Sequence, residues 1–277
     1  RYTIVDVNGN TWNEYVLKIG GSNGFSVKSI DKSDLTISFG RTSEDLSTFF
    51  NNYPPLIRYV DLSELDGNLI LKPQNPEELE LDQAIMEIWS WNDVDIKKES
   101  IWKNGIERKD SIQWKVAQKF IDADFDIVFD DDGSGEAADL VCFKEEKNHI
   151  CLVLIHCKYS GGKHAGVRIK DVVEVASQAV RSAKWPGRFR ELCAHLLNRN
   201  EKRKSSRRST FLIKGKLSDI TKMSRLARFK EIRTEIVIVQ PGIRKSKISN
   251  DQSQVLASAS VYIKETVNID LDIICSA

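Results

Sequence analysis

The apolar run ICLVLIHCK, residues 150–158, constrains the fold more than any other stretch of this chain. A strand of this composition belongs inside a sheet, where both of its faces are covered. The run ends in His156 and Lys158, which are costly to bury without partners. Because side chains alternate between the two faces of a strand, these two groups are predicted to lie about 7 Å apart on one face, with Cys157 on the other.

Long elements of alternating type surround this run. The periodicity predicts a helix over 109–123, strands over 125–129, 138–143 and 149–158, and a second helix over 169–185. Further helices are predicted over 188–198, 218–231 and 249–266, and further strands over 210–214, 235–240 and 271–275, with Pro241 closing the strand before it. This alternation indicates an α/β domain.

The short segment between the second and third of these strands predicts their register. If the residues EEKNH form a tight turn centred between Lys147 and Asn148, the numbers of paired residues sum to 295. Asp139 then lies opposite His156, so a carboxylate, an imidazole and the ammonium of Lys158 meet near the strand ends. A slip of one residue would break this arrangement, which makes the register a testable prediction.

The first part of the chain has a different pattern. From Tyr2 to about Pro73, short β-rich runs are separated by Gly, Asn and Asp at roughly 8–12-residue spacing, which predicts a small antiparallel sheet or barrel. One helix is predicted over 43–52, capped by Thr42. The stretch KPQNPEELELDQ, with two prolines and a run of acids, favours a boundary. We therefore expect a β-rich N-terminal domain at 1–82 and an α/β domain at 83–277.

The net charge of +1 hides an asymmetry between the two halves of the chain. Residues 1–140 carry a net charge of −13, and residues 141–277 carry +14. A basic half is typical of a surface that binds phosphate backbones. The alternative is that the acidic and basic halves pack against each other.

Composition also excludes several classes of protein. No apolar run approaches the roughly 18–20 residues of a membrane span, and no secretory leader precedes the start at Arg1. The absence of an initiator Met leads us to expect a fragment or a processed chain. The five cysteines are scattered without a CxxC pair, which predicts reduced thiols in a cytoplasm and no zinc site.

The segments EAADLV and IHCKYS resemble the site motif of the PD-(D/E)XK nuclease superfamily. The resemblance covers about residues 105–240 and implies a restriction-endonuclease-like core, a mixed central sheet flanked by helices in the order helix, three-stranded meander, helix, strand. Asp139 matches the family's Asp and Lys158 its Lys, while His156 stands where the family has an acid or a Gln. Gln178 resembles the supporting Gln found on the following helix in several branches of the family.

Phosphodiester hydrolysis gives these residues a chemical meaning. A hard cation neutralises a nonbridging oxygen and lowers the pKa of an attacking water, and carboxylates are its natural ligands. The predicted ligands are Asp139, His156 and the backbone carbonyl of Cys157, with Glu136 as a second carboxylate. Lys158, with a lowered pKa, is expected to orient or deprotonate the water. The expected ion is Mg²⁺ or Mn²⁺; a ligand at His156 favours Mn²⁺, unless His156 acts on water instead.

Other polar residues are assigned different roles. We expect Asp130, Asp131 and Asp132 to be solvated loop residues, and Gln113 to lie outside the metal site. Cys157 is excluded as a nucleophile because its side chain is on the face opposite His156.

The basic residues of the second half form the predicted nucleic-acid interface. The stretch SGGKHAG, residues 160–166, lacks the spacing of a phosphate-binding loop and is expected to border the substrate groove. The residues expected to contact the phosphate backbone are Lys163, Arg168, Arg181, Lys202, Arg203, Lys204, Arg207 and Arg208.

Three hypotheses for function remain. The first is a cytoplasmic, metal-dependent DNA nuclease in restriction or anti-phage defence, as a homo-oligomer or beside a helicase-type ATPase or other defence subunit; the defence role comes from the resemblance. The second keeps the fold without catalysis, so that the domain binds DNA or a protein partner. The third is a protein-interaction module in which the N-terminal domain recognises the partner, which predicts no nucleic-acid binding even at low salt.

Overall fold

The computed structural model describes residues 1–277 except 21–23, 32, 60–62, 73–78 and 204–210. The chain divides into two compact units, Arg1–Asn75 and Pro76–Ala277. The sequence-based boundary after residue 82 falls inside the second unit, where the short 3-10 helix η2 (Gln83–Ile85) leads into a strand. Within the described ranges, no helix is both long enough and apolar enough to cross a membrane.

The first unit consists mainly of short antiparallel strands in three small sheets, β1-β2-β3, β4-β5 and β6-β7-β8. Its elements are β1 (Tyr2–Val5), β2 (Thr11–Ile19), β3 (Phe25–Ser29), β4 (Thr36–Phe39), β5 (Thr42–Asp45), α1 (Leu46–Asn52), β6 (Ile57–Arg58), β7 (Glu64–Asp66) and β8 (Leu69–Leu71). The helix prediction was wrong at its start: Thr42 pairs with Phe39 in a hairpin, so α1 begins after Asp45. Tyr15, Val27 and Leu46 form the buried core.

The second unit is a mixed α/β fold built on a seven-stranded sheet, in the order β15-β12-β13-β14-β16-β17-β9. The strands are β9 (Met86–Ile88), β12 (Ile127–Asp130), β13 (Leu140–Glu145), β14 (His149–Cys157), β15 (Leu212–Lys214), β16 (Glu231–Arg244) and β17 (Leu271–Ser276), with a separate hairpin of β10 (Trp102–Lys103) and β11 (Ile106–Glu107). The helices are α2 (Ile112–Asp122), α3 (Lys170–Ser182), α4 (Phe189–Arg203), α5 (Leu217–Leu226) and α6 (Asn250–Val267), with the 3-10 turns η3 (Pro186–Arg188) and η4 (Lys245–Lys247).

The sheet combines an antiparallel half with a parallel half. The strands β12, β13 and β14 form an antiparallel meander, and β16 then runs parallel to β14. The predicted register is confirmed, because Leu140 pairs with Ile155 and Glu145 with Ile150. The tight turn at Lys147 and Asn148 fixes this register, since the N–H of Glu146 donates to the carbonyl of His149.

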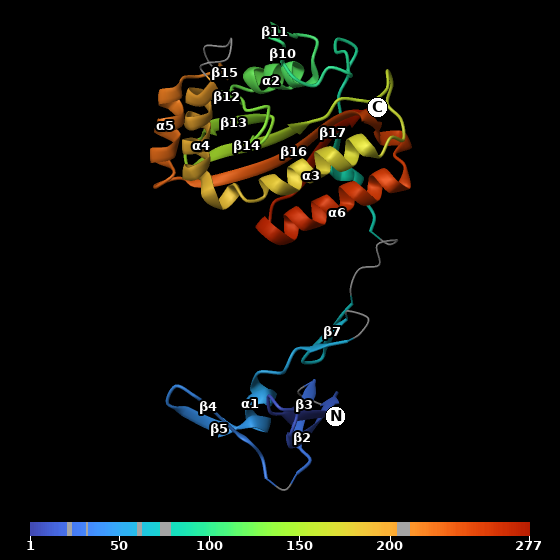
Figure 1. Ribbon diagram of the computed structural model, residues 1–277, viewed down its shortest axis with the longest axis vertical. Helices are drawn as coiled ribbons and strands as arrows, with labels where there is room; N and C mark the ends of the chain where they lie inside the picture. Colours follow the sequence, from blue (N-terminus) through green and yellow to red (C-terminus); the bar gives the residue numbers. More distant parts are fainter. Residues whose placement is uncertain (21–23, 32, 60–62, 73–78, 204–210) are drawn as a thin grey trace. The chain divides into compact units, whose positions relative to one another are not determined.

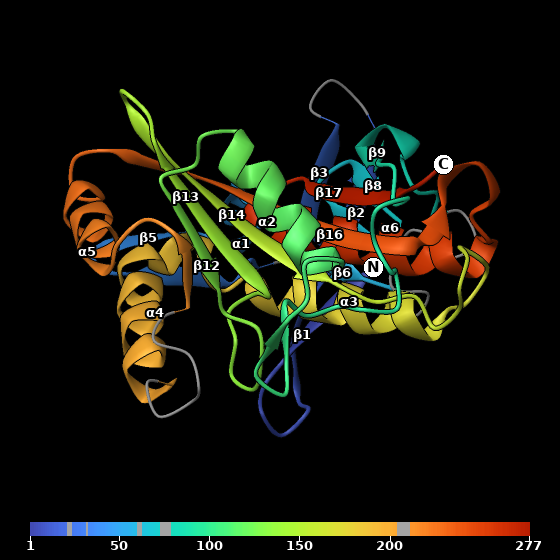
Figure 2. The ribbon, with the colours of Figure 1, turned by 90° about the horizontal axis from the view of Figure 1, so that it is seen from above.

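Helices cover both faces of the sheet. The helix α2 lies on one face, and α3 and α6 lie on the other (Figure 1). In the perpendicular view, α2 lies over the sheet and runs roughly along the strands of the meander (Figure 2). The even-numbered residues of β14, such as Leu152 and Leu154, pack in the α3 layer, and the odd-numbered ones, such as Val153 and Ile155, pack in the α2 layer. Both faces of β14 are therefore core, as its uninterrupted apolar sequence predicts.

The strand β16 does not end where the sequence suggests. It continues through Pro241 and Gly242 to Arg244, although its pairing with β17 shifts between Val239 and Arg244. Proline lacks a backbone N–H, and an irregularity of this kind is where a sheet accepts it. The side chain of Gln240 satisfies the backbone there by accepting a hydrogen bond from the N–H of Gly242 at 2.7 Å.

Candidate functional site

Three carboxylates gather between the end of β12 and the start of β13. One oxygen from each of Asp132, Glu136 and Asp139 lies within 4.8 Å of the others. The first two belong to the connecting loop, and Asp139 is the residue immediately before β13. These are called the acidic group below. Asp132 was expected to be a solvated residue outside the metal site, but its carboxylate belongs to this group.

The carboxylate of Asp139 is buried and held from two directions. Its Oδ2 accepts a hydrogen bond from the N–H of Cys157 at 2.7 Å, and its Oδ1 accepts one from Nε2 of Gln113 at 3.1 Å. Gln113 is itself fixed, because its Oε1 accepts from the N–H of Ile101. The sequence assigned Gln113 no part in the site, yet it ties Asp139 to α2.

The carboxylates of the acidic group are partly or fully buried and repel one another. Burial raises the pKa of Asp139 well above its usual range, and the charges of Glu136 and Asp132 raise it further. Burial also raises the pKa of Glu136, which is repelled by Asp132. A positive charge beside these groups would relieve both effects, because an opposite charge favours the ionised carboxylate.

Glu99 is a fourth acid of this region that the sequence did not reveal. It lies in the segment before α2, and its Oε2 accepts from the N–H of Tyr159 at 2.9 Å and is 3.3 Å from Nζ of Lys158. Burial raises its pKa, and its charge raises the pKa of Asp139 in turn. Glu99 lies outside the predicted strands and helices and well before the cap of α2 at Ser111, so no pattern in the sequence pointed to it.

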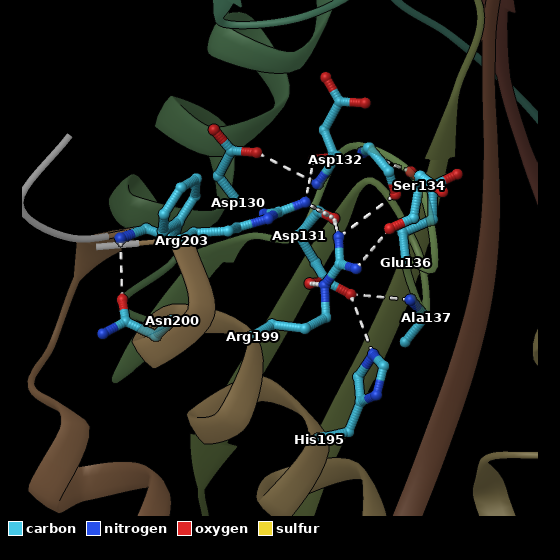
Figure 3. Close-up of polar contacts among 12 residues, drawn as sticks. Asp130, Asp131, Asp132, Ser134, Glu136, Ala137, His195, Arg199, Asn200 and Arg203 are labelled. Carbon is cyan, nitrogen blue, oxygen red and sulfur yellow. Dashed lines mark hydrogen bonds and ion pairs between the residues drawn. The ribbon is translucent and has the colours of Figure 1, made fainter. Parts of the chain in front are cut away.

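Two arginines of α4 hold the loop that carries the acidic group (Figure 3). Arg199 pairs with the carboxylate of Asp131 and donates to the carbonyls of Asp131 and Ser134 at 2.6 and 2.7 Å. Arg203 donates to the carbonyls of Asp131 and Asp132, and its guanidinium lies 4.5 Å from the ring centre of Phe211. These contacts are called the arginine clamp below.

The side chain of Asp131 points from this loop into the protein. Its side chain is fully buried, and its Oδ2 accepts from the N–H of Ala137 at 2.7 Å and lies 3.8 Å from Nε2 of His195. Asp130 is also buried, and its Oδ1 accepts from the N–H of Asp132. Both residues were expected to be solvated, but both are buried, and their side chains accept hydrogen bonds from the backbone of the loop.

The prediction that His156 and Lys158 share a face is confirmed. His156 lines a cavity together with residues of α3, and Lys158 forms an ion pair with a residue of α3. Nζ of Lys158 lies 2.6 Å from Oε1 of Glu174 on α3. Burial lowers the pKa of Lys158, but its hydrogen bond to Glu174 and the charges of Glu99 and Glu174 outweigh burial, so the pKa is raised. The expectation of a lowered pKa was wrong, and Lys158 is an ammonium rather than a base.

The expected meeting of Asp139 with His156 does not occur. His156 lines a cavity of about 560 Å³ whose walls include Glu136 and Gln178. Burial, and then the charge of Arg181, lower its pKa to about 3, so the imidazole is neutral. Gln178 contacts the acidic group, since its Nε2 donates to Oε1 of Glu136 at 3.2 Å. The thiol of Cys157 is buried in the α2 layer, as predicted.

The basic residues predicted to contact nucleic acid differ in their exposure and in their partners. Arg181, Lys163 and Lys202 are exposed. Arg168 is half-buried and donates to Oγ of Ser160 and to the carbonyl of His164. Arg203 belongs to the arginine clamp. The remaining three, Lys204, Arg207 and Arg208, lie outside the described residues.

A comparison of this chain with protein-family models, with curated proteins and with solved structures returned no match. The function of the chain is therefore inferred from the geometry of the site.

Proposed function

We propose that the second unit is a metal-dependent nuclease domain that hydrolyses phosphodiester bonds of DNA. The observation that carries this proposal is the acidic group, three carboxylates with oxygens within 4.8 Å of one another at the ends of two central strands. The ammonium of Lys158 lies 3.3 Å from Glu99, whose charge acts on Asp139. Acids that bind a cation, next to a fixed positive charge, suit a reaction at a phosphate.

The order of elements supports a restriction-endonuclease-like core. The helix α2 precedes the meander of β12, β13 and β14, the helix α3 follows it, and β16 adds a strand parallel to β14. This is the order that the PD-(D/E)XK resemblance implies, with Asp139 just before the second strand and Lys158 just after the third. The helices α4 and α5 and the edge strand β15 are inserted between α3 and β16.

The donor set fits Mg²⁺ or Mn²⁺. Asp132, Glu136 and Asp139 offer only oxygen ligands, which these hard cations prefer. Burial and mutual repulsion raise the pKa values of Glu136 and Asp139, an effect that a bound cation would offset. His156 lines the neighbouring cavity and is not part of the acidic group, so this donor set does not favour Mn²⁺ over Mg²⁺. Once bound, such an ion neutralises a nonbridging phosphate oxygen and lowers the pKa of the attacking water.

The residues of the chain itself have distinct parts in this proposal. Lys158 stays protonated and offsets the negative charge that builds up on the phosphate in the transition state. Gln113 and Gln178 orient Asp139 and Glu136 through the hydrogen bonds at 3.1 and 3.2 Å. The arginine clamp holds the loop that carries Asp132. Orientation of this kind is what maintains a ligand group before the ion arrives.

One observation favours a second candidate, a nuclease-like fold that binds DNA or a protein partner without cutting. Lys158 is engaged by two glutamates, Glu99 and Glu174, which neutralise the charge that catalysis needs. The setting in cytoplasmic restriction or anti-phage defence, as a homo-oligomer or with a helicase-type partner, is proposed from the resemblance alone.

DNA cleavage measured with Mg²⁺, with Mn²⁺ and with a chelator tests the proposal. We expect cleavage by the full chain with either ion and none with the chelator. Asp139→Asn keeps the shape of the residue and removes its charge, so the rate should fall roughly 10²–10³-fold, the size of effect expected when one electrostatic contribution to the transition state is lost. Equal cleavage by both proteins would refute the assignment, and DNA binding without any cleavage would favour the second candidate.

A further inference from the structure

The cavity that His156 lines is large enough for a small ligand and has a polar lining. It has a volume of about 560 Å³, within the roughly 300–1,000 Å³ range of small-ligand pockets. The loop between β12 and β13, the end of β14 and the last turns of α3 enclose it. Its polar lining residues include Glu136, His156, Gln178, Arg181, Lys184 and Trp185.

Three side chains of this wall have unused hydrogen-bonding atoms. His156 is 2% exposed, and neither of its ring nitrogens has a hydrogen-bond partner among the residues that the structure describes. In the same part of the chain, Oε1 of Gln178 and the indole N–H of Trp185 are also buried and unpartnered. Buried polar atoms are nearly always satisfied in folded proteins, so three such side chains in the wall of one cavity point to a ligand.

The chemistry of these atoms specifies the kind of ligand. A neutral imidazole offers one donor and one acceptor, Gln178 offers an acceptor, and the indole of Trp185 offers a donor. A phosphate only accepts hydrogen bonds, so it would leave two of these atoms unpaired, and it would be repelled by Glu136 in the same wall. A nucleobase is uncharged, presents donors and acceptors together, and has an apolar face.

The rim of the cavity fits the rest of a nucleotide. Arg181 and Lys184 are both exposed and line the cavity, so they are available to the phosphates on either side of a bound base. Glu136 belongs both to this wall and to the acidic group. A base in the cavity would therefore be part of the strand whose phosphate reaches the carboxylates.

We propose that this cavity holds one unpaired nucleobase of the strand that is cut. The inference rests on the proposed nuclease function and extends it, because it specifies the substrate as single-stranded DNA or a frayed end. Moving a base out of a duplex costs a few kcal/mol, whereas an unpaired base enters at little cost. Duplex DNA without an end should accordingly be cut more slowly than a single strand.

A set of single-stranded oligonucleotides, each with one abasic nucleotide at a successive position around the cut, tests the proposal on the wild-type chain. We expect one position at which loss of the base slows cleavage about tenfold, the effect of losing one bound base. In His156→Leu, which keeps the apolar volume and removes both nitrogens, the ratio of intact to abasic cleavage should fall toward one. A cleaving enzyme without any sensitive position would overturn the proposal and leave the nuclease assignment standing.

A binding measurement separates failure of this proposal from failure of the proposed function. Fluorescence of 2-aminopurine, placed at each position of a single strand, is recorded with Asp139→Asn, whose cleavage is expected to be roughly 10²–10³-fold slower. A change at one position that disappears when His156→Leu is added would support the cavity even if the wild-type chain cuts nothing. No change at any position, with DNA bound, would overturn it.

Discussion

Asp139 and His156 are neighbours in the register of β13 and β14 and are almost equally buried, at 1% and 2% exposed, but their surroundings differ. Both oxygens of Asp139 accept hydrogen bonds, from Gln113 and from the backbone of Cys157. Both nitrogens of His156 lack a partner in the described part of the chain. The first position is completed by the protein itself, whereas the second has capacity left for something else.

The difference shows what a register can and cannot determine. Pairing brings two backbones together, but the side chains that leave the ends of the strands follow whatever partners the neighbouring layers supply. Asp139 is drawn toward α2 by Gln113, and His156 remains on the α3 face beside Gln178. Two neighbouring positions at one end of a strand pair thus serve, in our proposals, a metal site and a base pocket.

The largest effect is expected from a substitution that breaks the arginine clamp. Arg199→Leu leaves the fully buried carboxylate of Asp131 without its cation. Removing one partner of a buried pair costs about 3–5 kcal/mol, so the free energy of unfolding of the second unit should fall by that amount. Urea unfolding followed by tryptophan fluorescence measures it, since five of the six tryptophans belong to this unit.

Arg190→Leu is the matched control for this substitution. Arg190 is on the same helix and exposed, so its replacement should change the free energy of unfolding by no more than about 0.5 kcal/mol. A similar loss in both variants would mean that α4, rather than the clamp, is sensitive, and no loss in Arg199→Leu would refute the clamp.

A smaller effect is expected from Gln113→Leu, which removes the hydrogen bond to Asp139 without touching the acidic group. Residues that orient metal ligands typically contribute 10–100-fold to metal affinity, so the affinity for Mn²⁺ should fall by about that factor. Isothermal titration of the metal-free protein with Mn²⁺ gives the value.

Gln118→Leu, a substitution of a partly buried glutamine on the same helix, serves as the control and should keep the wild-type affinity. Were the two variants to bind Mn²⁺ alike, the orientation of Asp139 by Gln113 would have no part in the metal site.

These residues also show which features of the site could be predicted from the sequence. The register was predictable, because the turn at Lys147 and Asn148 and the period of two leave little freedom. So was the shared face of His156 and Lys158. The direction of the Asp139 carboxylate was not, because it depends on a glutamine from a different layer of the fold.

The charges were the least predictable part. Arg203 belongs to a basic stretch that is typical of a nucleic-acid surface, yet its guanidinium is used inside the protein, on the carbonyls of Asp131 and Asp132. Glu99 reaches Lys158 only through the tertiary fold. A sequence gives the sign of a charge, but the backbone groups and counter-charges that use it are set by packing between distant segments.

The smallest expected effect concerns the protonation of His156. Its pKa is lowered from 6.5 to about 3, first by burial and then by Arg181. Between these two values the unfolded chain binds a proton that the folded chain does not, so His156 makes the fold less stable as the pH falls below about 6.5. His156→Phe removes that proton and leaves the other charges in place. The free energy of unfolding of the variant relative to wild type should therefore rise by roughly 1 kcal/mol between pH 6 and pH 5, without metal.

Leu154→Met is the matched control, because it changes the preceding inward position of β14 and adds no titrating group. Its cost should be below about 1.5 kcal/mol and constant over the same pH range. A rise with His156→Phe and a constant value with Leu154→Met would identify a neutral, unpartnered imidazole. A constant value for both would mean that the folded chain accepts the proton at His156 as readily as the unfolded chain does. His156 would then have a partner that stabilises its charge, and the contrast with Asp139 would disappear.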